Sequence, residues 1–168
     1  MKKVLLAIIG VLALVFVFTS AGFAQRHHLT YTSGHFSGDT ANNFFKTSAS
    51  IGNLDSAEAW LYAPVVFPDS ANGMQVTRLS CTLRDNSVTG LIQAQLYKVD
   101  RWSGLSTNVG WTSTGIAFAA TAVQFLNQPK SQLSARGIDN NRWAWVLVVY
   151  FSEGNTQLGL SHVTIRYE

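Results

Sequence analysis

Two histidines near the start of the chain occupy positions that suggest metal chemistry. If an export signal is removed after Ala24, the new terminus reads Gln25-Arg26-His27. A histidine third from a free amine can enclose Cu(II) or Ni(II) in a square plane of nitrogen ligands, and His28 could add a further ligand. An N-terminal glutamine tends to cyclise and lose its amine, and such a tripeptide also occurs by chance. The metal site therefore stands as a hypothesis, and we expect no resident cofactor.

Groups that could catalyse hydrolysis are scarce. Residues 34–38, Gly-His-Phe-Ser-Gly, place serine fourth, whereas a nucleophile elbow needs Gly-x-Ser-x-Gly between a strand and a helix. Paired carboxylates for glycoside hydrolysis can come from separate strands, and Asp55, Glu58 and Glu153 are available. Other acids lie beside turn-forming residues or strand ends: Asp69, Asp85, Asp100 and Asp139. We predict no catalytic residue and no enzymatic activity, with a glycoside or ester hydrolase as the third-ranked hypothesis.

Aromatic side chains are the better candidates for binding. Trp102 and Trp111 flank the Gly- and Ser-containing segment 103–110, which is predicted to be a loop. An exposed indole can stack on the apolar face of a sugar ring, because it is a large, rigid ring with one polar edge. The competing interpretation is that both side chains fold back and anchor the loop. On the first interpretation, Trp102 and Trp111 are the ligand-binding residues.

The first residues are typical of an export signal. A basic start at residues 1–3 precedes an apolar run at residues 4–18 and small residues at 21–24. The apolar run is shorter than the roughly 20 residues that cross a bilayer. Cys81 is the only cysteine, so it forms no internal disulfide and lies far from the cleavage region. We expect a periplasmic or extracellular protein, with no membrane association after cleavage at Ala24.

The charge of the chain argues against a nucleic-acid partner. The sequence holds 12 Lys and Arg against 9 Asp and Glu, and two of the bases, Lys2 and Lys3, belong to the predicted signal. The remainder carries 10 basic against 9 acidic residues, and the basic residues are spread singly along the chain. Nucleic-acid-binding proteins instead cluster their basic residues. The abundance of Ser, Thr, Asn, Gln and Gly suits polar, uncharged surroundings.

The elements that must position these residues are β-strands. Residues 143–151 have no polar break, and turn-forming segments at 139–141 and 152–155 enclose them. We predict one central strand that is apolar on both faces, so that both faces need covering. Weaker or alternating strand patterns occur at 58–67, 74–84, 91–99, 109–118, 120–126 and 158–167.

Short strands with regular turn signals predict an all-β fold, a single antiparallel β-sandwich of jelly-roll type. An immunoglobulin-like wiring is the runner-up, although its Cys, Trp, Cys core is absent. After the signal at 1–24, residues 25–56 are expected to form an extended arm and loop, and residues 57–168 the sandwich core of the same domain. The last strand is expected beside the central one, because it would be hazardous as an exposed edge.

Five strand and turn segments follow one another in a recognisable order along the chain: 63–69, 76–79, 85–86, 93–100 and 158–167. This series resembles a group of uncharacterised small exported bacterial β-sandwich proteins. The resemblance covers about residues 57–168. It implies the sandwich fold and brings no activity to any residue of this chain.

These observations rank three functions. The leading hypothesis is an exported, non-enzymatic β-sandwich that acts by association, as a cell-surface, matrix or assembly component that forms a homo-oligomer. Phe36, Phe44 and Phe45 are then expected either to cap the core or to pack against a partner chain. The alternative is a carbohydrate-binding module that binds a polysaccharide through Trp102 and Trp111. A hydrolase comes third.

Overall fold

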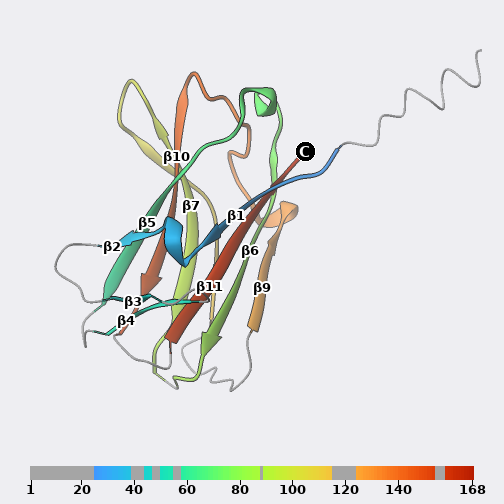
Figure 1. Ribbon diagram of the computed structural model, residues 1–168. Coiled ribbons are helices and arrows are strands. Elements are labelled where there is room, and N and C mark those ends of the chain that lie inside the picture. The colour runs from blue at the N-terminus through green and yellow to red at the C-terminus, as the bar shows by residue number, and fades with distance from the viewer. Residues whose placement is uncertain are drawn as a thin grey trace, which may run out of the picture.

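Two stacked antiparallel sheets make up the part of the chain that the computed structural model describes, residues 25–38, 44–46, 50–54, 58–87, 89–114, 124–153 and 158–168 (Figure 1). The predicted all-β, jelly-roll-like sandwich is confirmed. Within these ranges no helix is long and apolar enough to cross a membrane. The predicted export signal at 1–24 lies outside the described residues. Three short 3-10 turns connect strands: η1 (Ser33–His35), η2 (Asp69–Ala71) and η3 (Lys130–Gln132).

The first sheet, sheet A, is built around the last strand of the chain. Its strands are β1 (His27–Thr32), β3 (Phe44–Lys46), β4 (Ile51–Asn53), β6 (Val76–Asp85), β9 (Gln124–Pro129) and β11 (Leu158–Tyr167). β6 pairs along one side of β11, while β4 and then β1 share its other side. A bulge between Leu160 and His162 changes the alternation of β11, so that Leu158, Leu160, Val163 and Ile165 are all fully buried.

The second sheet, sheet B, has the predicted central strand in its middle. The strand order is β2 (Ser37–Gly38), β5 (Ala59–Val65), β10 (Trp143–Phe151), β7 (Ile92–Asp100) and β8 (Ser106–Ser113). The expectation that β11 lies beside β10 is wrong, because the two strands belong to opposite sheets. Each long apolar strand has partners on both sides in its own sheet, so neither forms an exposed edge.

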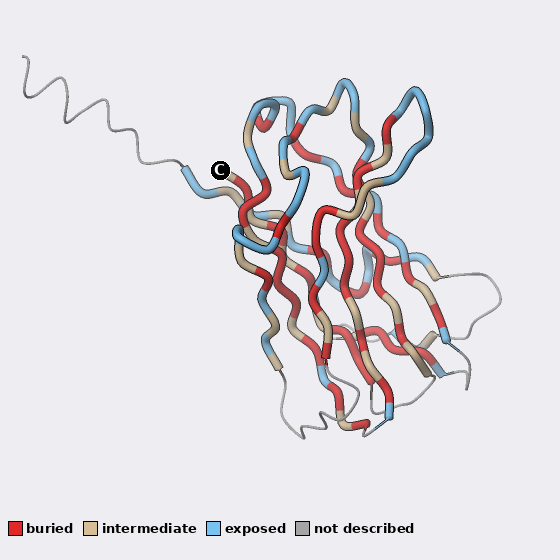
Figure 2. The backbone as a smooth tube through the Cα atoms, turned by 180° about the vertical axis from the view of Figure 1, so that it is seen from behind, coloured by how far each residue is buried: buried red, intermediate tan, exposed pale blue. Residues whose placement is uncertain are grey.

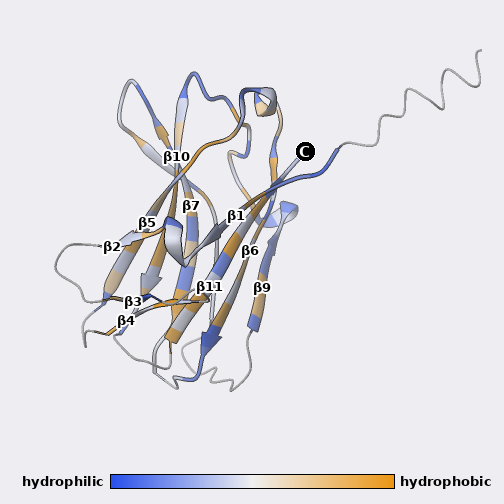
Figure 3. Cartoon of the chain, in the orientation of Figure 1, coloured by the Kyte–Doolittle hydropathy of each residue, from blue (hydrophilic) through white to orange (hydrophobic). Residues whose placement is uncertain are grey.

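Only one face of β10 is fully covered, whereas the sequence predicted cover on both. Leu147, Val149 and Phe151 are fully buried between the sheets. On the outer face Ala144 is exposed and Tyr150 is half-buried. Figure 2 shows the same alternation of buried and less buried positions along the strands, and Figure 3 shows it as alternating hydropathy. The outer face of sheet B is therefore a surface that can contact other molecules.

Residues 25–56 do more than form an arm. β1, β3 and β4 join sheet A, and β2 extends sheet B beside β5. Phe36 is 1% exposed in the core, and Phe44 packs against that core. The side chain of Phe45 lies outside the described residues. These contacts support the interpretation that the phenylalanines cap the core.

Candidate functional site

The outer face of sheet B collects aromatic rings and amides from four neighbouring strands. Alternation turns one residue in two outward on each strand, and the antiparallel register places the outward residues in rows across the sheet. We call this surface the aromatic face, and it comprises Trp60, Tyr62, Gln93, Gln95, Tyr97, Trp111, Val148 and Tyr150. Backbone register therefore brings together residues that are up to ninety positions apart in the sequence.

One row carries the two most exposed rings of this face. The row crosses four strands in register. It runs from Tyr62 on β5 through Val148 on β10 and Gln95 on β7 to Trp111 on β8. Tyr62 is 44% exposed and Trp111 is 51% exposed, so both rings project from the sheet. Three strand spacings separate them, which is about 14 Å. Gln95 lies between them and is only 8% exposed.

The neighbouring row is held by ring packing and one hydrogen bond. Trp60 and Tyr150 occupy paired positions, and their ring centroids lie 4.4 Å apart. The Tyr150 hydroxyl donates to Oε2 of Glu58 at 2.8 Å. Burial raises the pKa of Tyr150 above its ordinary value, and the Glu58 carboxylate raises it further. Tyr150 is thus a neutral donor at physiological pH, and its hydrogen bond fixes the orientation of the ring.

A chain of hydrogen bonds orients the amides between the rings. The Tyr97 hydroxyl donates to Oε1 of Gln95, and Nε2 of Gln95 donates to Oε1 of Gln93 at 2.6 Å. This order leaves the Gln93 amide group as the outermost donor of the chain. Flat rings beside oriented amide donors form a surface that suits a ligand with both apolar faces and hydroxyl groups.

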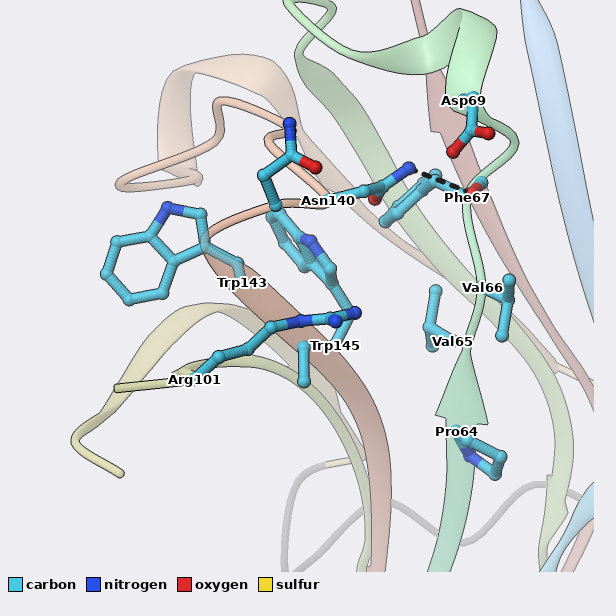
Figure 4. Close-up of a pocket in the computed structure, with 11 residues that line it drawn as sticks. Pro64, Val65, Val66, Phe67, Asp69, Arg101, Asn140, Trp143 and Trp145 are labelled. Atoms are coloured by element: carbon cyan, nitrogen blue, oxygen red, sulfur yellow. Dashed lines mark hydrogen bonds between the residues drawn. The ribbon is translucent and has the colours of Figure 1, made fainter. Parts of the chain in front are cut away.

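A pocket of about 450 Å³ opens where β5 and β10 separate, at one end of the aromatic face (Figure 4). The last register pair of the two strands is Trp145 with Val65, and the pocket lies beside it. Trp145 is 4% exposed, and its Nε1–H has no hydrogen-bond partner among the described residues. Arg101 extends across the pocket close to Trp145 (Figure 4). The exposed Arg101 guanidinium is therefore the donor that this end pocket can offer to a ligand, whereas the Trp145 Nε1–H is buried.

The structure separates the two tryptophans that the sequence proposed as a site. Trp111 belongs to β8 and the aromatic face, not to a loop. Trp102 lies at the tip of the β7–β8 hairpin and is 88% exposed. The loop-anchor interpretation is wrong for both, because neither indole is folded back. Whether either residue binds a ligand stays a prediction.

Asp100, rather than an indole, builds the turn of this hairpin. Its Oδ1 accepts hydrogen bonds from the backbone N–H groups of Trp102 at 2.9 Å and Ser103 at 3.0 Å. Arg142 Nε lies 3.2 Å from Oδ2 of the same carboxylate. These hydrogen bonds favour the carboxylate over the carboxylic acid and lower the pKa of Asp100 to about 2. The bonds from the backbone N–H groups have the largest effect. The turn is thus formed by an ionised carboxylate.

Other residues proposed from the sequence have structural partners. His27 stacks on Tyr167 with ring centroids 5.2 Å apart, while His28 follows it on the opposite face of β1. No group of three metal-binding side chains occurs in the described ranges, and the copper or nickel site stays an untested prediction. His35 Nδ1 bonds to the backbone N–H of Thr32 at 3.0 Å, so it serves the turn and does not activate Ser37.

The carboxylates considered for hydrolysis also serve the fold. Glu58 accepts the Tyr150 hydroxyl, and Glu153 accepts the Ser87 hydroxyl at 2.5 Å. Asp55 lies outside the described residues.

Cys81 is fully buried on the inner face of β6, and burial raises the pKa of its thiol to about 12. The thiol is therefore protonated and inaccessible.

The comparisons with known proteins indicate a fold and leave the sequence family open. No family model matches the chain, and no curated protein matches it. The chain is similar in fold to a xylan-binding module CBM15, with a TM-score of 0.50 and 9% identity over 84% of this chain and 97% of that one. It is also similar to the Clostridium thermocellum endo-1,4-β-D-xylanase 10B CBM22-1-GH10 modules complexed with xylohexaose, with a TM-score of 0.56 and 9% identity. That match covers 84% of this chain and 28% of that one. The chain thus shares the jelly-roll sandwich of carbohydrate-binding modules.

Proposed function

We propose that this protein is an exported, non-catalytic carbohydrate-binding module whose aromatic face binds a neutral polysaccharide. One observation carries the proposal: Tyr62 and Trp111 project from the two ends of a single row, with the Gln95 amide between them. Exposed rings of this size on one sheet face offer flat apolar contact area to a ligand. The similarity in fold to carbohydrate-binding modules is consistent with this role.

The polysaccharide crosses the strands of sheet B rather than following them. Stacking of sugar rings on Tyr62 at one end and Trp111 at the other supplies apolar contact. In the neighbouring row the Gln93 amide, held by the buried Gln95, donates hydrogen bonds to sugar hydroxyls. Since the hydrogen bonds from Tyr97 to Gln95 and from Gln95 to Gln93 already orient the amides, little side-chain entropy of these groups is lost on binding.

The end pocket extends the same surface. Pro64 and Ala144 lie on the outer side of β5 and β10 and also line this pocket. The Arg101 guanidinium there can bind oxygen atoms of a side group on the polysaccharide. The pocket then contributes to the choice between polysaccharides, while the two projecting rings supply general affinity.

The carbohydrate-binding hypothesis now ranks above the association role that the sequence favoured. The outer face of sheet B presents amide donors between rings, whereas an apolar self-association interface would be poorer in polar groups at its centre. A hydrolase stays third. Glu58 and Glu153, two carboxylates that the sequence offered for that chemistry, are hydrogen-bonded in structural roles.

The test is binding of the protein that begins at Gln25 to a panel of neutral polysaccharides, including xylan, mannan and galactan. We expect saturable binding with a change in tryptophan emission, and a several-fold loss of affinity in Trp111→Ala. Trp102→Ala is the matched control, because it removes an equally large, more exposed indole at the hairpin tip. Failure to bind any of the panel, or equal losses in the two variants, would reject the proposal.

A further inference from the structure

The outer face of sheet A carries a row of basic side chains. His28 on β1 pairs with Arg166 on β11, and Arg166 pairs with Arg78 on β6. Register thus places three basic residues side by side on adjacent strands, at intervals of about 4.8 Å. The row lies on the opposite side of the sandwich from the aromatic face, so the two surfaces cannot contact the same stretch of a ligand.

The two arginines are poorly neutralised by the protein. Arg78 makes no ion pair or hydrogen bond through its guanidinium within the described ranges. Arg166 reaches Glu168 only through Nη2, at 3.6 Å, and its buried Nε has no partner there. Glu168 also lies 3.9 Å from Arg26, so one carboxylate is shared between two arginines. The row therefore retains positive charge and an unused donor.

Hydroxyl groups and one exposed ring border the basic row. The next row along the strands is Thr30, Thr164 and Ser80. Phe125 on β9 is 64% exposed and follows one row further along, paired with Thr82. A pocket of about 190 Å³ is lined by His28, Arg78, Ser80, Phe125, Thr164 and Arg166, with no acidic side chain among them.

We propose that this basic row is a second binding site, for an acidic polysaccharide. The arginines bind the anionic groups, the exposed Thr30 and its neighbour Thr164 contact sugar hydroxyls, and Phe125 packs against the apolar face of a ring. A repeat of one basic residue per strand matches a polymer that carries its charge at regular short intervals. The narrow row and the adjacent hydroxyls favour a sugar polymer over a nucleic acid, which would need a broader basic surface.

The site extends what the protein can do. With a neutral polysaccharide on sheet B and an acidic one on sheet A, a single molecule can cross-link two different polymers. The two sites are tested independently, because their residues belong to opposite sheets. Trp111→Ala is expected to leave acidic binding unchanged, and Arg78→Gln to leave neutral binding unchanged.

The test measures binding of polygalacturonate, which carries carboxylates, and of dextran sulfate, which carries sulfates, at low and moderate salt. We expect at least one of the two to bind, and Arg78→Gln to lose about tenfold in affinity, as for a charge-assisted hydrogen bond. Arg84→Gln is the matched control, since it removes the same charge from the same face of β6, six residues away. Phe125→Ala is a second variant that weakens binding without changing charge. Which polymer binds more tightly identifies the anion.

Three results would overturn the site. The first is that neither polymer binds at low salt. The second is that Arg78→Gln and Arg84→Gln lose affinity equally, which would mean that net charge alone matters. The third is that single-stranded DNA binds as tightly as the acidic polysaccharides and with the same dependence on Arg78. Thermal unfolding of each variant, expected to match the parent protein, shows that the loss is local.

Discussion

The separation of Tyr62 and Trp111 predicts how affinity depends on the length of the ligand. The two residues lie three strand spacings apart, about 14 Å, so one short oligosaccharide cannot stack on both rings. Stacking on one ring contributes about 1 kcal/mol, which is about fivefold in affinity. Groups this far apart contribute additively, so the polymer gains about 2 kcal/mol, or about 30-fold, from the pair.

The perturbation is Tyr62→Ala and Trp111→Ala, singly and together, measured by calorimetric titration with an oligosaccharide series of the polysaccharide that binds best. In the parent protein, affinity should rise with length until the ligand spans both rings and then stay level. Each single variant should lose about fivefold for long ligands and remove most of the length dependence. The double variant should lose about 30-fold.

Two results would refute this reasoning. A disaccharide that binds as tightly as the polymer would show that the ligand does not span the row. A double variant no weaker than the single ones would show that the two rings do not act on one ligand. Both side chains are about half exposed, so the free energy of unfolding should change by no more than about 0.5 kcal/mol. Urea unfolding of the variants checks this.

Two further predictions concern strands β7 and β8, which support the aromatic face. Because the folded-state pKa of Asp100 is about 2, below the ordinary 3.8, its contribution to stability is present above pH 3.8 and is lost as the pH falls towards 2. Urea unfolding at several pH values gives the free energy of unfolding of the parent protein and of Asp100→Asn. The difference between the two should shrink as the pH falls from 3.8 towards 2. A difference that stays constant would contradict the lowered pKa of Asp100. Gly110→Ala should destabilise the protein by about 1 kcal/mol, because the added Cβ would meet Cδ2 of Leu133 and Oε1 of Gln128, and the ends of these two buried side chains must move aside. Thermal unfolding measures this effect, and Gly34→Ala, where nothing lies within 4 Å of the added atom, is the control that should keep the parent stability.

Local pattern predicted the strands well where apolar residues alternate or run without a break. β10 occupies 143–151 as expected, and the apolar residues that alternation turns inward on β6 and β7 are fully buried, although Ser80 and Gln95 on the outer faces are buried as well. The placement of β11 could not be predicted in this way. Alternation shows which face of a strand is apolar, whereas the choice of sheet depends on pairing between segments far apart in sequence.

The aromatic face was harder to predict than the core. Trp60 and Tyr62 read as part of an apolar strand, because aromatic side chains count as hydrophobic in any periodicity argument. The signal was present in β7, where Gln93, Gln95 and Tyr97 alternate with core residues and so share the outer face. Only the register across β5, β10, β7 and β8 shows that these residues and Trp111 form one surface.

The division of each strand into an inner and an outer set separates stability from binding. Leu61, Leu96 and Leu147 are fully buried, and truncating one to alanine should cost about 2 to 5 kcal/mol. The exposed outer residues, such as Tyr62 and Trp111, can change with little effect on folding. Because the same argument holds for both sheets, one rigid core supports an aromatic face on one side and a basic row on the other, and the exposed residues of each surface can be changed independently.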